Sequence, residues 1–287
     1  MGGRIIVGVD GSGPSQSALR WAARRAKITG SELTIEYVVD ADWGQMGDAF
    51  ARQGSADGER LLAAAMTTVG PIGCTVNVEL AHGNPALTLA SDSKPGDLIV
   101  VGTHKTGFIR GRVLGTRSIA VASVAPCSVV VVPEDTVSHR RGIVVGVAGG
   151  DRGDVAVVAG AIEAQFTGED LTLVHAGART DAVDGLLAAA AALASATAPR
   201  VIVRRRHSGR SRTDTLLDLS RSATLLVLGE SRIDPDRAGF LGSVTHEVLL
   251  NLNSPVLVAR TPIRPGRDHN LEYGTQQPET ETETAGG

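Results

Sequence analysis

The sequence predicts an α/β protein with two tandem open parallel sheets of five strands each, with helices on both faces of each sheet. Short apolar runs alternate with stretches of helical periodicity, which is the pattern of repeated βαβ units with right-handed crossovers. The chain is 42% hydrophobic but only 3% aromatic, so Val, Ile, Leu and Ala must fill its core. Such a core suits buried parallel strands and alanine-rich helices. At 287 residues the chain is long enough for two domains.

An internal duplication supports two domains of the same kind. Two segments recur at an offset of 138 residues and two more at an offset of 127. The first two matches are 5–11 with 143–149 and 33–35 with 171–173, and the others are 98–102 with 225–229 and 114–116 with 241–243. The second copy has therefore lost 11 residues between its second and fourth strands.

The elements of the first copy follow from this pattern in order. Ser12 or Ser15 can cap the first helix, and Pro85 suits the first turn of the third. The segment 40–56 is rich in Gly and Asp and is expected to form a long flexible connection. We expect strands near 4–9, 33–39, 74–81, 97–102 and 128–132, and helices near 15–29, 57–69, 85–93 and 115–124.

Changes of composition divide the chain into a first domain at 1–135, a polar linker at 136–142, a second domain at 143–262 and a tail at 263–287. The tail has almost nothing to bury, so we expect it to be disordered. No apolar targeting run or membrane-length window is present, so we expect a cytoplasmic protein. The net charge of −3 gives no reason to expect nucleic-acid binding.

A ligand site is expected beyond the carboxyl ends of the first and fourth strands, where the strand order of an open parallel sheet reverses. Asp10 and Gly11 follow the first strand, and Gly102 ends the fourth. The loop 103–114 is a 12-residue structureless connection, which is long for such a unit and more often functional than idle.

The chemistry of this loop suits phosphate. Gly115 lets a ligand approach the backbone, Thr116 offers a hydroxyl, and the helix that begins there points free N–H groups at an anion. The alternative is a glycine-rich surface loop with solvated basic residues and an ordinary Thr cap. His104 either contacts phosphate or faces solvent. Positive charge comes from Lys105, Arg110, Arg112 and Arg117.

The loop resembles the nucleotide signature of universal stress proteins, G-x2-G-x9-G-[ST]. The similarity spans about 3–135 and 141–261, with supporting blocks at 7–12, 83–86, 97–102 and 254–258. It implies a tandem member of that family with an adenine-nucleotide α-hydrolase-like, Rossmann-like fold. In ATP-binding members the residue matching Asp10 lies by the ribose and adenine, and backbone near Val38 contacts the base. The implied site comprises Asp10, Gly11, Val38, Gly102, Thr103, His104, Lys105, Gly115, Thr116 and Arg117.

Both copies depart from the family pattern. Lys105 replaces the second glycine, where its side chain either obstructs the ligand or contacts phosphate. In the second copy Ala148 replaces the aspartate, and two loop carboxylates, Asp234 and Asp236, bring like charge toward the phosphate region. We therefore expect a weaker second site at Gly229, Arg232, Gly242, Ser243 and Val244.

The resemblance implies a stress-response module that binds ATP or another adenine nucleotide, with or without Mg²⁺, and signals through occupancy. The alternatives are a nucleotide-free protein–protein scaffold and a slow ATP hydrolase. We identify no catalytic residues and no metal ligands, so turnover is expected to be at most weak. Family members usually associate through the fifth strand, which implies an internal pseudo-dimer through 129–132 and 256–258 and, further, a possible homodimer.

Overall fold

The computed structural model describes residues 3–40, 48–103, 108–109, 112–113, 116–134, 139–149, 151–230 and 241–260. The expected end of the first domain at 135, residues 136–138 of the linker and the whole tail lie outside these residues. Within them, no helix is both long enough and apolar enough to cross a bilayer.

Strands and helices alternate through both copies, as predicted. The first copy contains β1 (Ile5–Gly8), α1 (Gly13–Thr29), β2 (Leu33–Asp40), α2 (Asp48–Val69), β3 (Val76–Gly83), α3 (Pro85–Ser91), β4 (Leu98–Thr103), β5 (Phe108–Ile109), β6 (Arg112–Val113), α4 (Thr116–Val124) and β7 (Ser128–Pro133). The second contains β8 (Ile143–Gly146), α5 (Asp151–Thr167), β9 (Leu171–Ala176), α6 (Asp181–Thr197), β10 (Val203–Ser208), α7 (Arg212–Ser220), β11 (Leu225–Gly229), α8 (Ser243–Leu250) and β12 (Val256–Ala259).

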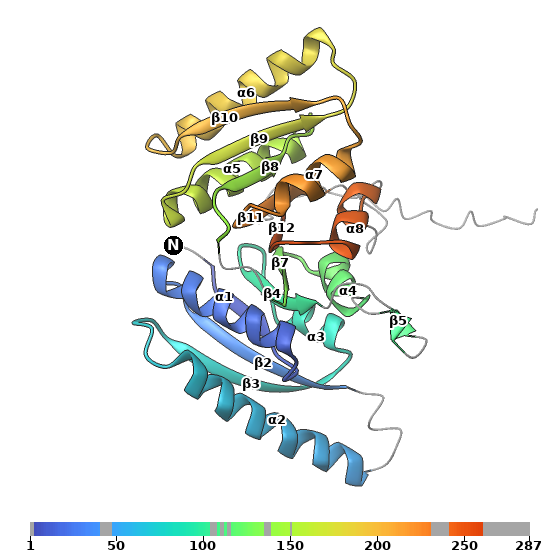
Figure 1. Ribbon diagram of the computed structural model, residues 1–287. Coiled ribbons are helices and arrows are strands. Elements are labelled where there is room, and N and C mark those ends of the chain that lie inside the picture. Colours follow the sequence, from blue (N-terminus) through green and yellow to red (C-terminus); the bar gives the residue numbers. More distant parts are fainter. Residues whose placement is uncertain are drawn as a thin grey trace, which may run out of the picture.

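The two five-stranded sheets join into one sheet of ten strands in the order β10-β9-β8-β11-β12-β7-β4-β1-β2-β3. Every neighbouring pair is parallel except β7 and β12, which meet antiparallel at the centre of the molecule (Figure 1). Val129, Val130 and Val131 pair with Val258, Leu257 and Val256. Val130 and Leu257 are equivalent positions of the two copies at the offset of 127, and they pair with each other. The residues on either side pair in reciprocal fashion, so a pseudo-twofold axis passes between Val130 and Leu257. The apolar fifth strands predicted to form the contact do form it.

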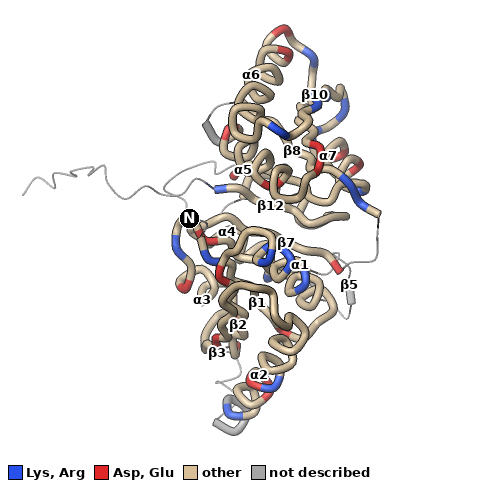
Figure 2. The backbone as a smooth tube through the Cα atoms, turned by 90° about the vertical axis from the view of Figure 1, so that its left-hand side faces the viewer, with Lys and Arg blue, Asp and Glu red and all other residues tan. Residues whose placement is uncertain are grey.

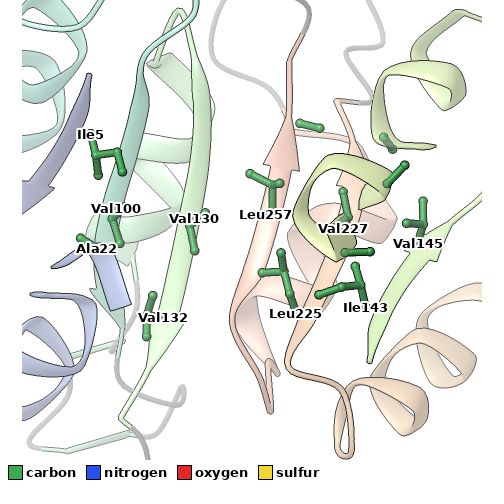
Figure 3. Packing of buried hydrophobic residues seen from close by; sticks show 14 of the residues in the cluster. Ile5, Ala22, Val100, Val130, Val132, Ile143, Val145, Leu225, Val227 and Leu257 are labelled. Carbon is green, nitrogen blue, oxygen red and sulfur yellow. The ribbon is translucent and has the colours of Figure 1, made fainter. Parts of the chain in front are cut away.

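Two apolar layers cover the sheet. Helices α1, α2, α5 and α6 pack on one face, and α3, α4, α7 and α8 pack on the other. The first layer continues across the junction of the two halves, where Val130 lies opposite Leu257, with Val100 and Val227 one strand further out on either side (Figure 3). The halves are therefore joined by packing as well as by strand pairing.

The free edges of the sheet are β3 and β10. Strand β10 carries Arg204, Arg205 and Arg206, which are all exposed, and Figure 2 shows this basic stretch at the outer end of the second half. Adjacent like charges on an edge strand oppose pairing with another sheet edge.

Two arginines, one partly buried and one buried, connect the halves. Arg25 of α1 lies 2.5 Å from the Glu163 carboxylate of α5, and its guanidinium carbon lies 4.9 Å from the centre of the Phe166 ring. Arg260 follows β12 and is only 7% exposed. Its side chain donates hydrogen bonds to Glu230 and to the carbonyl oxygens of Ala122 and Cys127 in the first half. These contacts join residues too far apart in sequence for any local pattern to reveal.

The expected flexible connection over 40–56 is wrong in its second part, because α2 begins at Asp48. Residues 49–53 include good helix formers, and isolated glycines cost only about 1 kcal/mol each in a helix. Gly58 has a packing role instead. A Cβ atom there would lie 2.6 Å from Tyr37 and 2.7 Å from Leu80, so the glycine lets α2 approach β2 and β3.

The expected structureless loop after β4 is also wrong in part. Phe108–Ile109 pairs antiparallel with Arg112–Val113 as the short hairpin β5–β6. Only two residues separate these strands, which is the spacing of a tight β-hairpin. The remainder of the loop lies outside the described residues.

The registers locate the 11 residues that the second copy lacks. Glu36 pairs with Glu79, 43 residues later, whereas the equivalent Val174 pairs with Arg206, 32 residues later. The whole deletion thus falls between the second and third strands of the copy. There α2 has 22 residues and its counterpart α6 has 17.

Candidate functional site

A cleft of about 360 Å³ opens beyond the carboxyl ends of β1 and β4, where the strand order reverses. Strands β1, β2 and β4 and the helices α1, α3 and α4 all contribute to it. The lining residues are Gly8, Val9, Asp10, Ser15, Tyr37, Val38, Asp40, Pro85, Leu89, Val101, Gly102, Arg117, Ser118 and Val121.

Asp10 is held at the mouth of this cleft by the turn that leads into α1. The backbone N–H of Ser12 donates to Asp10 Oδ1 at 3.0 Å, and Ser12 caps the helix through its hydroxyl, 3.3 Å from the Ser15 nitrogen. Burial tends to raise the pKa of Asp10. Hydrogen bonds from Ser12 and Ser15 and the charge of Arg117 outweigh burial and lower the pKa below its ordinary value. Asp10 therefore presents an ionised carboxylate at neutral pH.

Gly102 allows α1 to begin directly against the end of β4. A Cβ atom at Gly102 would lie 2.4 Å from the Pro14 carbonyl carbon and 2.6 Å from the Ser15 nitrogen. Its lack of a side chain thus has a packing reason that is independent of any ligand. The same close approach brings Asp10 and the end of β4 into one cleft.

Among the described residues that line the cleft, Arg117 supplies positive charge. It lies in the first turn of α4, and its guanidinium Nη2 is 2.8 Å from Asp40 Oδ2 at the end of β2. The Arg117 side chain is 73% exposed, whereas that of Asp40 is 17% exposed. The arginine is therefore anchored at one side and open to an anion from solvent.

The remaining wall is apolar. Val38 and Tyr37 come from β2, Leu89 from α3 and Val121 from α4. Asn84 caps α3 by accepting hydrogen bonds from the Ala86 and Leu87 nitrogens, which fixes that helix at the rim. An apolar wall facing a carboxylate and a guanidinium suits a ligand with a flat apolar ring, hydroxyls and a negative charge.

The structure brings together four of the predicted site residues, namely Asp10, Val38, Gly102 and Arg117. Gly11 adjoins Asp10, and Thr103 ends β4 as a buried residue that does not line the cleft. Thr116 begins α4, but its side chain lies outside the described residues, as do His104, Lys105 and Gly115. Sequence reasoning missed Tyr37 and Asp40, although their position at the end of the second strand was a usable signal.

The corresponding region of the second copy has different chemistry. Ala148 stands in place of Asp10, and Glu230 directly follows Gly229, in the position of Thr103. Glu230 is 2.8 Å from the Arg260 guanidinium. His175 replaces Tyr37, and its Nδ1 is 3.0 Å from the Val147 carbonyl oxygen.

Three residues of the expected weaker second site begin or precede α8. Gly242 caps that helix without a side-chain hydrogen bond, and Ser243 and Val244 form its first turn. Arg232 and the loop carboxylates lie outside the described residues. The described part of this region thus keeps the backbone elements of the first site but lacks its carboxylate.

Comparison with known proteins agrees with the duplication. The model of the universal stress protein family matches residues 1–133 and again 139–260. A universal stress protein of Mycobacterium tuberculosis is 31% identical, over 89% of this chain and 96% of its own length. One from Mycolicibacterium smegmatis is 28% identical over the same shares. The crystal structure of a universal stress protein from Archaeoglobus fulgidus superposes with a TM-score of 0.74 at 18% identity, covering 91% of this chain and 97% of that one.

Proposed function

The chain belongs to the universal stress protein family, and we propose that its first half binds ATP or a related adenine nucleotide in the cleft between β1 and β4. The observation that carries this proposal is the convergence of an ionised carboxylate, an exposed arginine and an apolar wall on one cleft of about 360 Å³. The protein then acts as a stress-response module whose state depends on nucleotide occupancy.

Each group has a role that its chemistry supports. Asp10 accepts hydrogen bonds from ribose hydroxyls, because its ionised carboxylate is an acceptor only. Val38 and Leu89 pack against the adenine ring. Arg117 pairs with phosphate oxygens, for which its planar guanidinium is well suited, and phosphate competes with Asp40 for it. The start of α4 adds free backbone N–H groups beside the phosphates.

In the second half we propose much weaker binding or none. Ala148 removes the acceptor for ribose, and the carboxylate of Glu230 stands next to Gly229, where phosphate oxygens would approach. Paired with Arg260, this carboxylate is an acceptor only and offers a phosphate no hydrogen-bond donor. The same two residues favour a scaffold role for this half, with the first half alone responding to nucleotide.

The decisive experiment is calorimetric titration of nucleotide-free protein with ATP, with and without Mg²⁺. We expect one site per chain. Asp10→Ala should weaken binding by about tenfold or more, because a hydrogen bond to a charged group contributes about 1.5–3 kcal/mol. The matched control is Asp154→Ala, which removes an exposed carboxylate of α5 and should bind as the wild type does.

Each outcome is informative. Two sites per chain would show that Ala148 is tolerated, contradicting the asymmetry. Wild-type affinity in Asp10→Ala would refute the position of the site. No heat and no thermal shift with ATP, ADP or AMP would refute nucleotide binding and leave the scaffold role.

A further inference from the structure

Three carboxyl groups from three different elements converge on the α3 face of the first half. Glu36 lies in the middle of β2, Glu79 is its register partner on β3, and Asp92 is the residue that ends α3. One carboxylate oxygen from each lies within 4.8 Å of the others. None of the three lines the nucleotide cleft, so this cluster is separate from the site described above.

Glu36 is the unusual member of the cluster. It is only 1% exposed, and neither of its carboxylate oxygens has a hydrogen-bond partner among the described residues. A buried ionised carboxylate without a partner is strongly unfavourable, so such a group normally pairs with a cation or coordinates a metal. The two orphaned carboxylate oxygens of Glu36 therefore indicate a missing cation partner beside the cluster.

Arg4 only partly compensates the negative charge of this cluster. Arg4 Nη1 lies 3.8 Å from the Glu79 carboxylate, and Arg4 Nη2 lies 3.7 Å from that of Asp97. The Arg4 guanidinium also donates to the backbone carbonyl of Asp92 rather than to its carboxylate. One arginine shared with Asp97 leaves the three carboxylates of the cluster undercompensated.

The second copy shows that the fold does not need a carboxyl group at these places. Registers align Glu36 with Val174 and Glu79 with Arg206, and the constant offset aligns Asp92 with Leu219. Val174 is 2% exposed, so an apolar side chain fills the equivalent buried position. A carboxylate at Glu36 is therefore a local feature of the first half that packing alone does not explain.

We propose that Glu36, Glu79 and Asp92 form a binding site for a hard divalent cation of the class of Ca²⁺, Mg²⁺ and Mn²⁺. Such ions prefer carboxylate oxygens. Two oxygens bound to the same Ca²⁺ at about 2.4 Å each can lie up to about 4.8 Å apart. The three carboxylate oxygens lie within that separation of one another. The Glu79 side chain is 44% exposed and gives the ion a route from solvent. Water completes the coordination on that side.

The test uses the full chain, freed of nucleotide and treated with EDTA. Thermal unfolding is measured in CaCl₂, MgCl₂ or MnCl₂ up to about 10 mM, the range of weak calcium sites, and bound Mn²⁺ is counted by electron paramagnetic resonance. We expect one ion per chain and a rise in Tm of about 5 °C at saturation. Glu36→Gln and Glu79→Gln should each weaken binding by about tenfold or more.

Glu59→Gln is the matched control, because Glu59 is an exposed carboxylate on α2 outside the cluster. It should bind the ion as the wild type does, and so should Asp10→Ala, which separates this site from the nucleotide cleft. If the buried Glu36→Gln variant fails to fold, the half-exposed Glu79→Gln still decides the matter. Absence of a Tm rise with all three cations, or wild-type binding by Glu79→Gln, would overturn the proposal.

Discussion

Replacing Arg260 with methionine should weaken the whole molecule, because this side chain joins its two halves. Methionine keeps the apolar stem and removes the guanidinium. The change eliminates a 2.8 Å ion pair with Glu230 and a 2.9 Å hydrogen bond to the Cys127 carbonyl oxygen. It also eliminates the hydrogen bond to the Ala122 carbonyl oxygen in the last turn of α4.

The size of the effect follows from burial. Arg260 is 7% exposed, so water cannot readily replace the hydrogen bonds that its guanidinium donates. Breaking a buried charge pair by removing one partner costs about 3–5 kcal/mol, and the stranded carbonyl oxygens act in the same direction. For a protein of this size we expect the Tm to fall by about 10 °C.

Urea unfolding followed by circular dichroism measures the loss. Arg206→Met is the matched control, because Arg206 is exposed on the edge strand β10. It should change the free energy of unfolding by less than about 0.5 kcal/mol. If Arg260→Met differs from this control by less than about 1 kcal/mol, the idea that Arg260 fastens the halves together is refuted.

Three further substitutions test other parts of the structure. Gly102→Ala should cost about 1–3 kcal/mol in urea unfolding and weaken ATP binding, because its Cβ would lie 2.4 Å from the Pro14 backbone; unchanged stability would contradict the close packing. Gly185→Ala, where no atom lies within 4 Å of the added Cβ on α6, should instead stabilise by about 0.5–1 kcal/mol in the same assay, and a loss would contradict the open position. Burial raises the pKa of Glu163 above 4.5 despite the charge of Arg25, so the folded state holds its proton more tightly than the unfolded chain. The stabilisation from that proton is complete below pH 4.5 and is lost as the pH rises through the pKa of the folded state. The unfolding free energy of the wild type minus that of Glu163→Gln should therefore fall over that pH range. A difference that stays constant with pH would contradict the raised pKa.

The sequence predicted the features that arise from local pattern or from repetition. Buried Val and Ile runs predicted the parallel strands, and the constant offsets revealed the duplication. The contact of 129–132 with 256–258 was implied by the resemblance to universal stress proteins. Asp10 and Gly102 were identified because the sequence places each near the carboxyl end of a strand that opens on the cleft. The start of α2 was missed because the Gly and Asp residues of 40–56 were taken as signs of a loop.

The features that escaped prediction depend on tertiary contacts. Glu36 sits inside an apolar strand, and nothing near it in sequence indicates that Glu79 and Asp92 lie within 4.8 Å. Arg260 reaches residues more than 130 positions earlier, and Arg25 meets Glu163 across the two halves. Such pairings follow from how helices pack on the sheet, which periodicity alone does not specify.

The antiparallel pairing of β7 with β12 also bears on how the two halves could diverge. In a dimer of identical chains, every substitution appears on both sides of the twofold axis. Here the two sides are encoded separately, so Ala148, Glu230 and Val174 alter one side and leave the other intact. Because the partners share one chain, their effective concentration does not fall on dilution. One half can therefore lose its pocket chemistry and still serve the other as a permanent partner.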